Sequence, residues 1–389
     1  FFDLASGQPI PLEMPAQVTS RQITAMASGG GNAPRLAVGT ADGEILFLKV
    51  GTTTEFTDQG ERRKRPHIRA GQPIPLTKSP IVRLAYRAND QGSLLALLSK
   101  GGRLLVVRIA ADDVAGDHPI ITELPQPKGV VTALALDALL ENLYVGTADG
   151  QVVHVALSET ESPEMRAAYT VAASSTAVTT LGFLSGDRSL VVMSEDGAVS
   201  TWGLVRRADA PSGWKLTQIH TLRPHNAPVT AFAPSQRVKG FVTGDMKGNL
   251  FLHHATSSQT LLRLANSEFP IRAVAFAPKG DGLIALDGAG QLSLYQVQNA
   301  YPEVTLETLF AKVWYEGYDQ PAHVWQSSSG SDDVEPKLGL LPLAFGTLKG
   351  TMYALFLAVP IAILAAMCTS QFMHQDLRAK IKPIIEVMA

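Results

Sequence analysis

A sequence pattern that recurs six times constrains the fold of this 389-residue chain more than any other feature. Each copy has a β-branched start, an apolar segment, a turn, a second apolar segment that ends in small polar residues, and then a glycine and a third segment. The glycines are Gly43, Gly102, Gly150, Gly197, Gly248 and Gly290. Their spacings of 59, 48, 47, 51 and 42 residues bracket the ~40–50 residues of a four-stranded propeller blade. The repeats therefore predict an all-β propeller; the alternative is a β-sandwich with accidental similarity between the copies.

The local chemistry of each copy also fits a blade. An Asp-Gly or Lys-Gly pair between two apolar strands supplies the positive φ that a tight hairpin requires. The segments that follow the glycines alternate or are apolar, as half-buried strands are. Variable segments such as Thr217–His225 and Thr260–Ala265 leave room for a fourth, outer strand.

The first residues of the chain extend the pattern. Phe1–Leu4 (FFDL) matches the closing FLKV, TWGL and LYQV of other copies, so it is interpreted as the tail of an earlier blade. The segment GQPIPL occurs at Gly7–Leu12 and again at Gly71–Leu76, which suggests equivalent outer-strand positions. We therefore expect a seven-bladed propeller over residues 1–313 with a truncated first blade. Trp202 resembles the Trp of WD repeats, so the propeller is expected to be WD40-like, with this side chain packing between blades.

A long apolar stretch follows the repeats. No charged side chain occurs from Gly350 to Cys368, and a helix needs about 20 apolar residues to cross a bilayer. We therefore expect a transmembrane helix over residues 342–373, preceded by a polar linker over 314–341 that contains Ser327–Asp333. Residues 374–389 are expected to form a cytoplasmic loop and the start of a further helix.

The flanking charges predict the orientation of this helix. Arg378, Lys380 and Lys382 follow it, and basic residues favour the cytoplasmic side. The propeller is then expected on the periplasmic side. Small residues and a mid-span Pro360 favour one helix of a bundle, and a single-span anchor is the alternative.

Composition excludes several classes of function. The net charge of -2 gives no basic bias toward nucleic acid. The single cysteine, Cys368, excludes a disulfide within the chain. The sequence contains no nucleophile elbow, HExxH or P-loop motif. We therefore predict no catalytic residues, no cofactor and no metal, and the substrate-binding residues remain unassigned.

Two clusters of side chains are candidate sites. His253 and His254 are neighbours on a predicted strand, near His220 and His225 in sequence. Adjacent strand residues point to opposite faces, so the first two cannot share a metal, and ordinary surface histidines are expected. The basic run Arg62–Arg65 is either a contact for an acidic partner or lipid, or a solvated edge strand whose charges block aggregation, and the second interpretation is favoured.

The C-terminal region resembles a known family. Gly346-Thr347-Leu348, Val359-Pro360-Ile361 and Glu386 after a basic loop resemble the C-type permease subunit of the phosphate-specific transport system, an ABC importer. The segment VWQSSSGSDDVEPKLGLLPL resembles a subgroup with a large extramembrane insertion. The resemblance implies a multi-pass protein of the bacterial inner membrane with no enzymatic activity of its own. Its implied partners are a second permease subunit, an ATPase subunit that hydrolyses ATP, a periplasmic solute-binding protein and membrane lipid.

The sequence leaves two other functions open. One is a membrane-tethered propeller scaffold or sensor of the cell envelope. The other is a propeller enzyme such as a quinone-dependent dehydrogenase.

Overall fold

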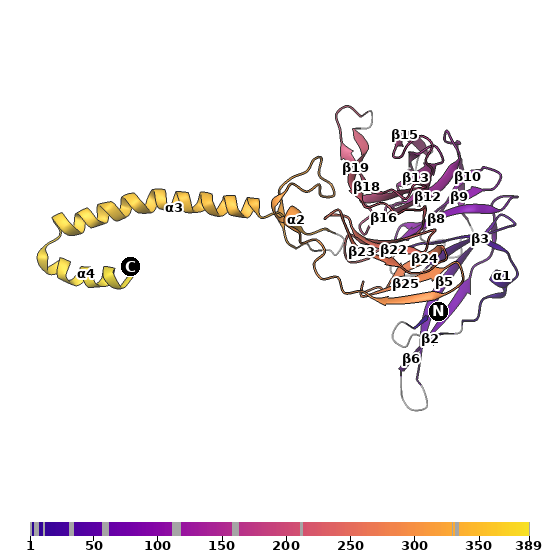
Figure 1. Cartoon of the computed structure of the whole chain (residues 1–389), viewed down its shortest axis with the longest axis horizontal. Helices are drawn as coiled ribbons and strands as arrows, with labels where there is room; N and C mark the ends of the chain where they lie inside the picture. Colours follow the sequence, from indigo (N-terminus) through magenta and orange to yellow (C-terminus); the bar gives the residue numbers. More distant parts are fainter. Residues whose placement is uncertain are drawn as a thin grey trace.

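The computed structural model is a six-bladed β-propeller followed by one apolar helix (Figure 1). The structure describes residues 2–3, 8–10, 12–30, 35–56, 62–110, 118–157, 163–210, 213–328, 330 and 334–388. Within these ranges, each sequence copy forms one antiparallel sheet.

The first three blades use the strands that the repeats predicted. Blade one contains β3 (Ile23–Ser28), β4 (Arg35–Thr40), β5 (Glu44–Phe56) and β6 (Arg62–Ala70), with β7 (Ile74–Pro75) also paired to β5. Blade two contains β8 (Ile81–Asn89), β9 (Gly92–Ser99), β10 (Leu104–Ala110) and β11 (Ile120–Leu124). Blade three contains β12 (Val131–Leu136), β13 (Asn142–Thr147), β14 (Gln151–Ala156) and β15 (Glu164–Thr170).

The last three blades continue the order. Blade four contains β16 (Val178–Phe183), β17 (Ser189–Ser194), β18 (Val199–Arg206) and β19 (Trp214–Leu222). Blade five contains β20 (Val229–Pro234), β21 (Gly240–Asp245), β22 (Asn249–His254) and β23 (Gln259–Ala265). Blade six contains β24 (Ile271–Phe276), β25 (Gly282–Asp287) and β26 (Leu292–Gln296). The outer strands expected in Thr217–His225 and Thr260–Ala265 are confirmed as β19 and β23.

The structure does not support the expected seventh blade. Among the described residues, β1 (Phe2–Asp3) pairs only with β2 (Gln8–Pro9). Phe1 and residues 4–7 lie outside the described residues. A short helix, α1 (Ala16–Thr19), follows and leads into blade one.

The hairpin turns confirm the predicted role of the glycines. All six have φ between +76° and +85°. In five of the blades the polar residue that ends the second strand accepts backbone N–H groups of the turn. For example, Asp245 Oδ1 accepts the N–H groups of Lys247 and Asn249, each at 2.9 Å. In blade three the hydroxyl of Thr147 accepts the N–H of Gln151 at 3.2 Å.

From the second copy onward, the β-branched residue that starts each copy packs against the preceding blade. Ile81 and Ile271 are fully buried. They lie over Gly39 and Gly244, where an added Cβ would come within 2.8 and 2.5 Å of them. A glycine in the second strand therefore allows close packing of neighbouring blades.

The chain leaves the propeller through a helix that projects away from it (Figure 1). This is α3 (Leu341–Met367), continued by a π-helical turn, η1 (Cys368–Phe372). Among the described residues it is the one helix long and apolar enough to cross a membrane. Residues 374–389, expected to form a loop and the start of a further helix, are helical over most of their length as α4 (Gln375–Met388), which carries the three basic residues.

Candidate functional site

Residues 305–340, called the strap below, join blade six to α3. The strap begins with α2 (Leu306–Phe310), whose N-terminus is closed by a reciprocal capping box between Thr305 and Thr308. It ends where the N–H of Leu340 donates to the carbonyl of Leu309 at 2.8 Å. A two-stranded pairing of β27 (Trp325–Gln326) with β28 (Lys337–Leu338) lies between these points. Figure 1 shows this region, marked by α2, between the blades and α3.

The sequence indicated a polar linker here, but much of the strap packs against the propeller. Tyr315, Glu335 and Lys337 are 2%, 5% and 6% exposed. The acidic residues Asp332 and Asp333 lie outside the described residues. The helix therefore starts from a folded segment rather than from a free tether.

A buried ion pair fixes the strap to blades four and five. Lys239 lies in the loop between β20 and β21, and its Nζ is 2.6 Å from Oε2 of Glu316. The same ammonium group donates to the carbonyl of Ser185, and Ser189 Oγ donates to Oε1 of Glu316 at 2.6 Å. Buried charges are stable only when paired and hydrogen-bonded in this way.

A second carboxyl group lies beside this pair. Thr256 Oγ1 donates to Oε2 of Glu335 at 2.5 Å, and the N–H of Glu316 donates to its other oxygen. Burial and the neighbouring Glu316 raise the pKa of Glu335 to about 7. The carboxyl group of Glu335 therefore titrates near neutral pH.

The third and fourth strands of blade four also contact the strap. His220 Nε2 lies 3.1 Å from the carbonyl of Trp314, and the N–H of Arg206 donates to Asp319 at 3.1 Å. Burial lowers the pKa of His220 to about 4. Because the ring is then neutral at pH 7, its nitrogen can donate to the Trp314 carbonyl only as the Nε2–H tautomer.

A pocket of about 300 Å³ lies between blade four and the strap. Its aromatic lining comes from both sides: from the blades Tyr144, Phe183, Trp202 and Trp214, and from the strap Trp314, Tyr315 and Tyr318. Lys239, Glu316 and Glu335 lie at the same pocket. Aromatic walls with a few fixed charged groups are typical of ligand and peptide pockets.

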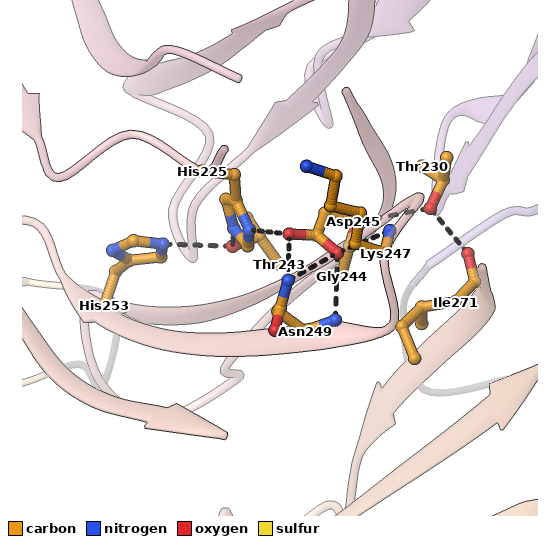
Figure 2. A network of polar contacts seen from close by, with 9 residues as sticks. All are labelled: His225, Thr230, Thr243, Gly244, Asp245, Lys247, Asn249, His253 and Ile271. Atoms are coloured by element: carbon orange, nitrogen blue, oxygen red, sulfur yellow. Dashed lines mark hydrogen bonds and ion pairs between the residues drawn. The ribbon is translucent and has the colours of Figure 1, made fainter. Parts of the chain in front are cut away.

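The expectation of surface histidines is wrong for blade five. His225, His253 and His254 are 2%, 0% and 2% exposed. His225 lies between Asp245 and Thr243, and Thr243 also contacts His253 (Figure 2). His225 Nδ1 is 2.9 Å from Oδ2 of Asp245, its Nε2 is 2.7 Å from Oγ1 of Thr243, and that hydroxyl is 3.0 Å from Nε2 of His253. This network connects the end of β21 to β22 and is structural.

The two neighbouring histidines have different partners. His253 contacts Thr243 and Thr260, whereas His254 contacts Ser257 at 2.9 Å. Burial lowers the pKa of His253 to about 3 and that of His254 to about 4. In the described part of the chain, no group of three or more His, Cys, Asp or Glu side chains could hold a metal ion.

The two remaining candidates from the sequence are Trp202 and the basic run Arg62–Arg65. Trp202 packs in the apolar cluster shared by blades three and four, and its Nε1 donates to Ser200 Oγ at 2.8 Å. The basic run Arg62–Arg65 lies on β6, an edge strand of blade one. Arg65 is exposed and 3.5 Å from Glu55, which fits the solvated edge strand.

Sequence reasoning missed the residues that fix the strap. Lys239 is an isolated lysine in a loop, and Glu316 belongs to a stretch interpreted as linker. The available signal was aromatic density: Trp314, Tyr315 and Tyr318 are unusual for a solvated linker.

Comparisons with known proteins support the fold. No family model and no curated protein matches the chain. The β-propeller domain of Cps50 (Swd1) from Myceliophteria thermophila matches with a TM-score of 0.52 at 15% identity, over 71% of this chain and 84% of that one. A chain of the Mitotic Checkpoint Complex has the same TM-score and identity, over 72% and 76%. Sqt1 from Chaetomium thermophilum, bound to the N-terminus of ribosomal protein L10, matches with a TM-score of 0.52 at 14% identity, over 70% and 72%. The chain is thus similar in fold to WD40-type propellers.

Proposed function

We propose that the propeller is a protein-interaction module that is mechanically coupled to a membrane helix. The observation that carries this proposal is the buried pair of Lys239 and Glu316, which fixes to the blades the strap that leads into α3. A structural change caused by binding to blades four and five would therefore be transmitted to the helix through the packed side chains of the strap. The solved structure of Sqt1 with a ribosomal-protein segment is a precedent for a propeller that binds a protein segment.

We further propose that the membrane helix belongs to the permease subunit of an ABC importer, with phosphate as its substrate. Support comes from the resemblance of Gly346-Thr347-Leu348 and Val359-Pro360-Ile361 to that family. All side chains of the central apolar window of this helix are unburied in the isolated chain. Since Thr347, Gly350 and Thr351 suit close packing against neighbouring helices, a bundle is the favoured setting.

In this proposal the propeller lies in the periplasm and binds a protein partner of the importer, such as the solute-binding protein. The pocket between blade four and the strap is the proposed contact, because its lining combines aromatic groups with charged groups. The chain itself performs no bond chemistry, and ATP hydrolysis takes place on another subunit.

Purification of the intact protein from membranes tests this proposal. Mild-detergent extraction should recover an ATPase subunit and a second permease subunit with it. Tyr318→Ala in the pocket should weaken recovery of the periplasmic partner but not of the ATPase. The exposed-site variant Arg103→Ala on blade two is the matched control and should recover every partner.

A membrane-tethered scaffold or sensor is the second candidate, favoured by the similarity of the propeller to solved propellers such as Sqt1, which is bound to a protein segment. In that case the purified protein would lack an ATPase subunit, and its membrane part would contain one span.

A further inference from the structure

The six blades do not pack evenly around the ring. The inner strands of consecutive blades pack against each other from β3 to β8, β12, β16, β20 and β24. Among the described residues, β24 and β3 show no comparable packing. The ring therefore has an open seam between blades six and one.

The blade-six side of this seam is apolar and unpartnered. Ile284 and Leu292 are partly exposed, and Leu294 is 39% exposed. At the equivalent positions of blade five, Val242 and Leu250 are 0% and 2% exposed, because blade six covers them. The equivalent pairs of the other blades are also at most 4% exposed: Ala37 and Ile45, Ala96 and Leu104, Tyr144 and Val152, and Val191 and Val199.

The first strand of blade six shows the same difference. Ala273 and Ala275 are exposed. Their equivalents in blade five, Ala231 and Ala233, are 6% and 8% exposed. The face thus has the composition of a blade interface without a neighbouring blade.

The blade-one side is unpartnered at its inner end. Ile23 is 46% exposed. Its equivalents in the other five blades are 0% to 7% exposed: Ile81, Val131, Val178, Val229 and Ile271. Farther out, Val18 of α1 packs on Val38, Leu46 and Leu48, so the segment ahead of β3 already covers part of this face.

The pairing of β1 with β2 indicates what fills the seam. In blade one the second GQPIPL segment runs along the third strand: Gly71 donates to Phe47, and β7 pairs with β5. The first GQPIPL segment contributes β2, which pairs with β1. Since β1 carries the FFDL sequence that matches the FLKV of β5, the same sequence element pairs with the same kind of strand in both places.

We propose that a seventh antiparallel sheet occupies this seam, with β1 as its third strand and β2 as its outer strand. Its two inner strands are supplied by a further segment of the same polypeptide. This source follows from topology, because in each of the six blades the second strand directly precedes the third through a tight turn. The inference does not depend on the proposed transport function.

Cysteine accessibility in the intact protein, in its native membrane, tests this proposal. In a Cys368→Ser background, single variants Ile23→Cys and Leu294→Cys place thiols on the two sides of the seam. Ile120→Cys on β11, where the native side chain is 65% exposed, is the matched control. A maleimide should label the two seam thiols at least about tenfold more slowly than the control, since a buried thiol reacts only after local opening.

Two results would overturn the proposal. Equal labelling rates at all three positions would mean that the seam is open. Protection that disappears on dilution after solubilisation, or cross-links between two copies, would assign the seam to a second molecule. If Leu294→Cys fails to fold, Ala273→Cys on the same face adds one sulfur atom at an exposed site and gives the same readout.

Discussion

Nζ of Lys239 lies 2.6 Å from Oε2 of Glu316, and both side chains are at least 90% buried. The first residue belongs to blade five and the second to the strap, so this pair fixes the segment from which the membrane helix starts. The proposed coupling between the propeller and the membrane depends on this contact.

Replacing Lys239 with Met should loosen the strap without unfolding the blades. Removing one partner of a buried ion pair costs roughly 3–5 kcal/mol, because the other charge stays buried and unpaired. Hydrogen exchange should therefore accelerate at the amides of Gly339 and Leu340, which close the strap. The exposed pair of Arg103 and Glu123 supplies the control, since solvent-exposed ion pairs contribute little to stability and Arg103→Ala should leave hydrogen exchange in the strap unchanged. Unchanged exchange in Lys239→Met would contradict the role of the pair.

Two turn glycines with similar φ should respond differently to alanine. A Cβ on Gly248 would lie 1.9 Å from the carbonyl oxygen of Ser267, whereas a Cβ on Gly290 meets nothing within 4 Å. Gly290→Ala should therefore cost only the left-handed backbone strain of about 1–2 kcal/mol. Gly248→Ala should cost clearly more, measured as the free energy of unfolding in urea. Equal losses would show that the backbone of Ser267 does not restrict the turn at Gly248.

The buried histidines should make the propeller sensitive to acid. Burial lowers the pKa of His154, His220 and His254 to about 4 and that of His253 to about 3. Between about pH 6.5 and 4 the unfolded chain binds protons that the folded chain does not, so stability falls as the pH falls. Each histidine contributes about 1.4 kcal/mol per pH unit in this window. His254→Gln should make the free energy of unfolding depend less steeply on pH. An unchanged slope of this dependence would mean that His254 is not buried as a neutral ring.

Glu335 should act in the opposite direction. Its pKa is raised to about 7 in the folded state, so the folded chain holds a proton that the unfolded chain releases between about pH 4.5 and 7. Its contribution to stability is therefore present at low pH and is lost as the pH rises. The free energy of unfolding of Glu335→Gln should equal that of the wild type near pH 5. Near pH 8 it should be higher than that of the wild type by roughly 1–3 kcal/mol. A variant less stable at pH 8 would show that the carboxylate is needed in its charged form.

The sequence predicted the local parts of this fold well. The turn glycines, the small polar residue ahead of each turn and the apolar helix are all set by neighbours in the chain, so periodicity and turn chemistry were enough. The glycines at Gly39 and Gly244 could be explained only with the structure, because Ile81 and Ile271 come from the next blade.

The sequence was less informative where partners lie far apart in the chain. The histidines of blade five are buried because Thr243, Asp245 and Thr260 satisfy their nitrogens, and a single-strand pattern cannot show this. Glu316 and Lys239 belong to segments with no shared periodicity. Closure of the propeller ring also depends on contacts between residues far apart in the chain, which a repeat pattern does not show. The expected seven blades were not supported, because the described residues form six blade sheets.

Phosphate uptake tests the central claim most directly. Cells that lack other phosphate importers should lose uptake of radiolabelled phosphate when the intact gene is deleted, and the wild-type gene should restore it. Lys239→Met should restore uptake only in part at an equal amount of membrane-inserted protein, while Arg103→Ala should restore it fully. Unchanged uptake after deletion would contradict the transport function, and full restoration by Lys239→Met would contradict the coupling of the propeller to the membrane helix.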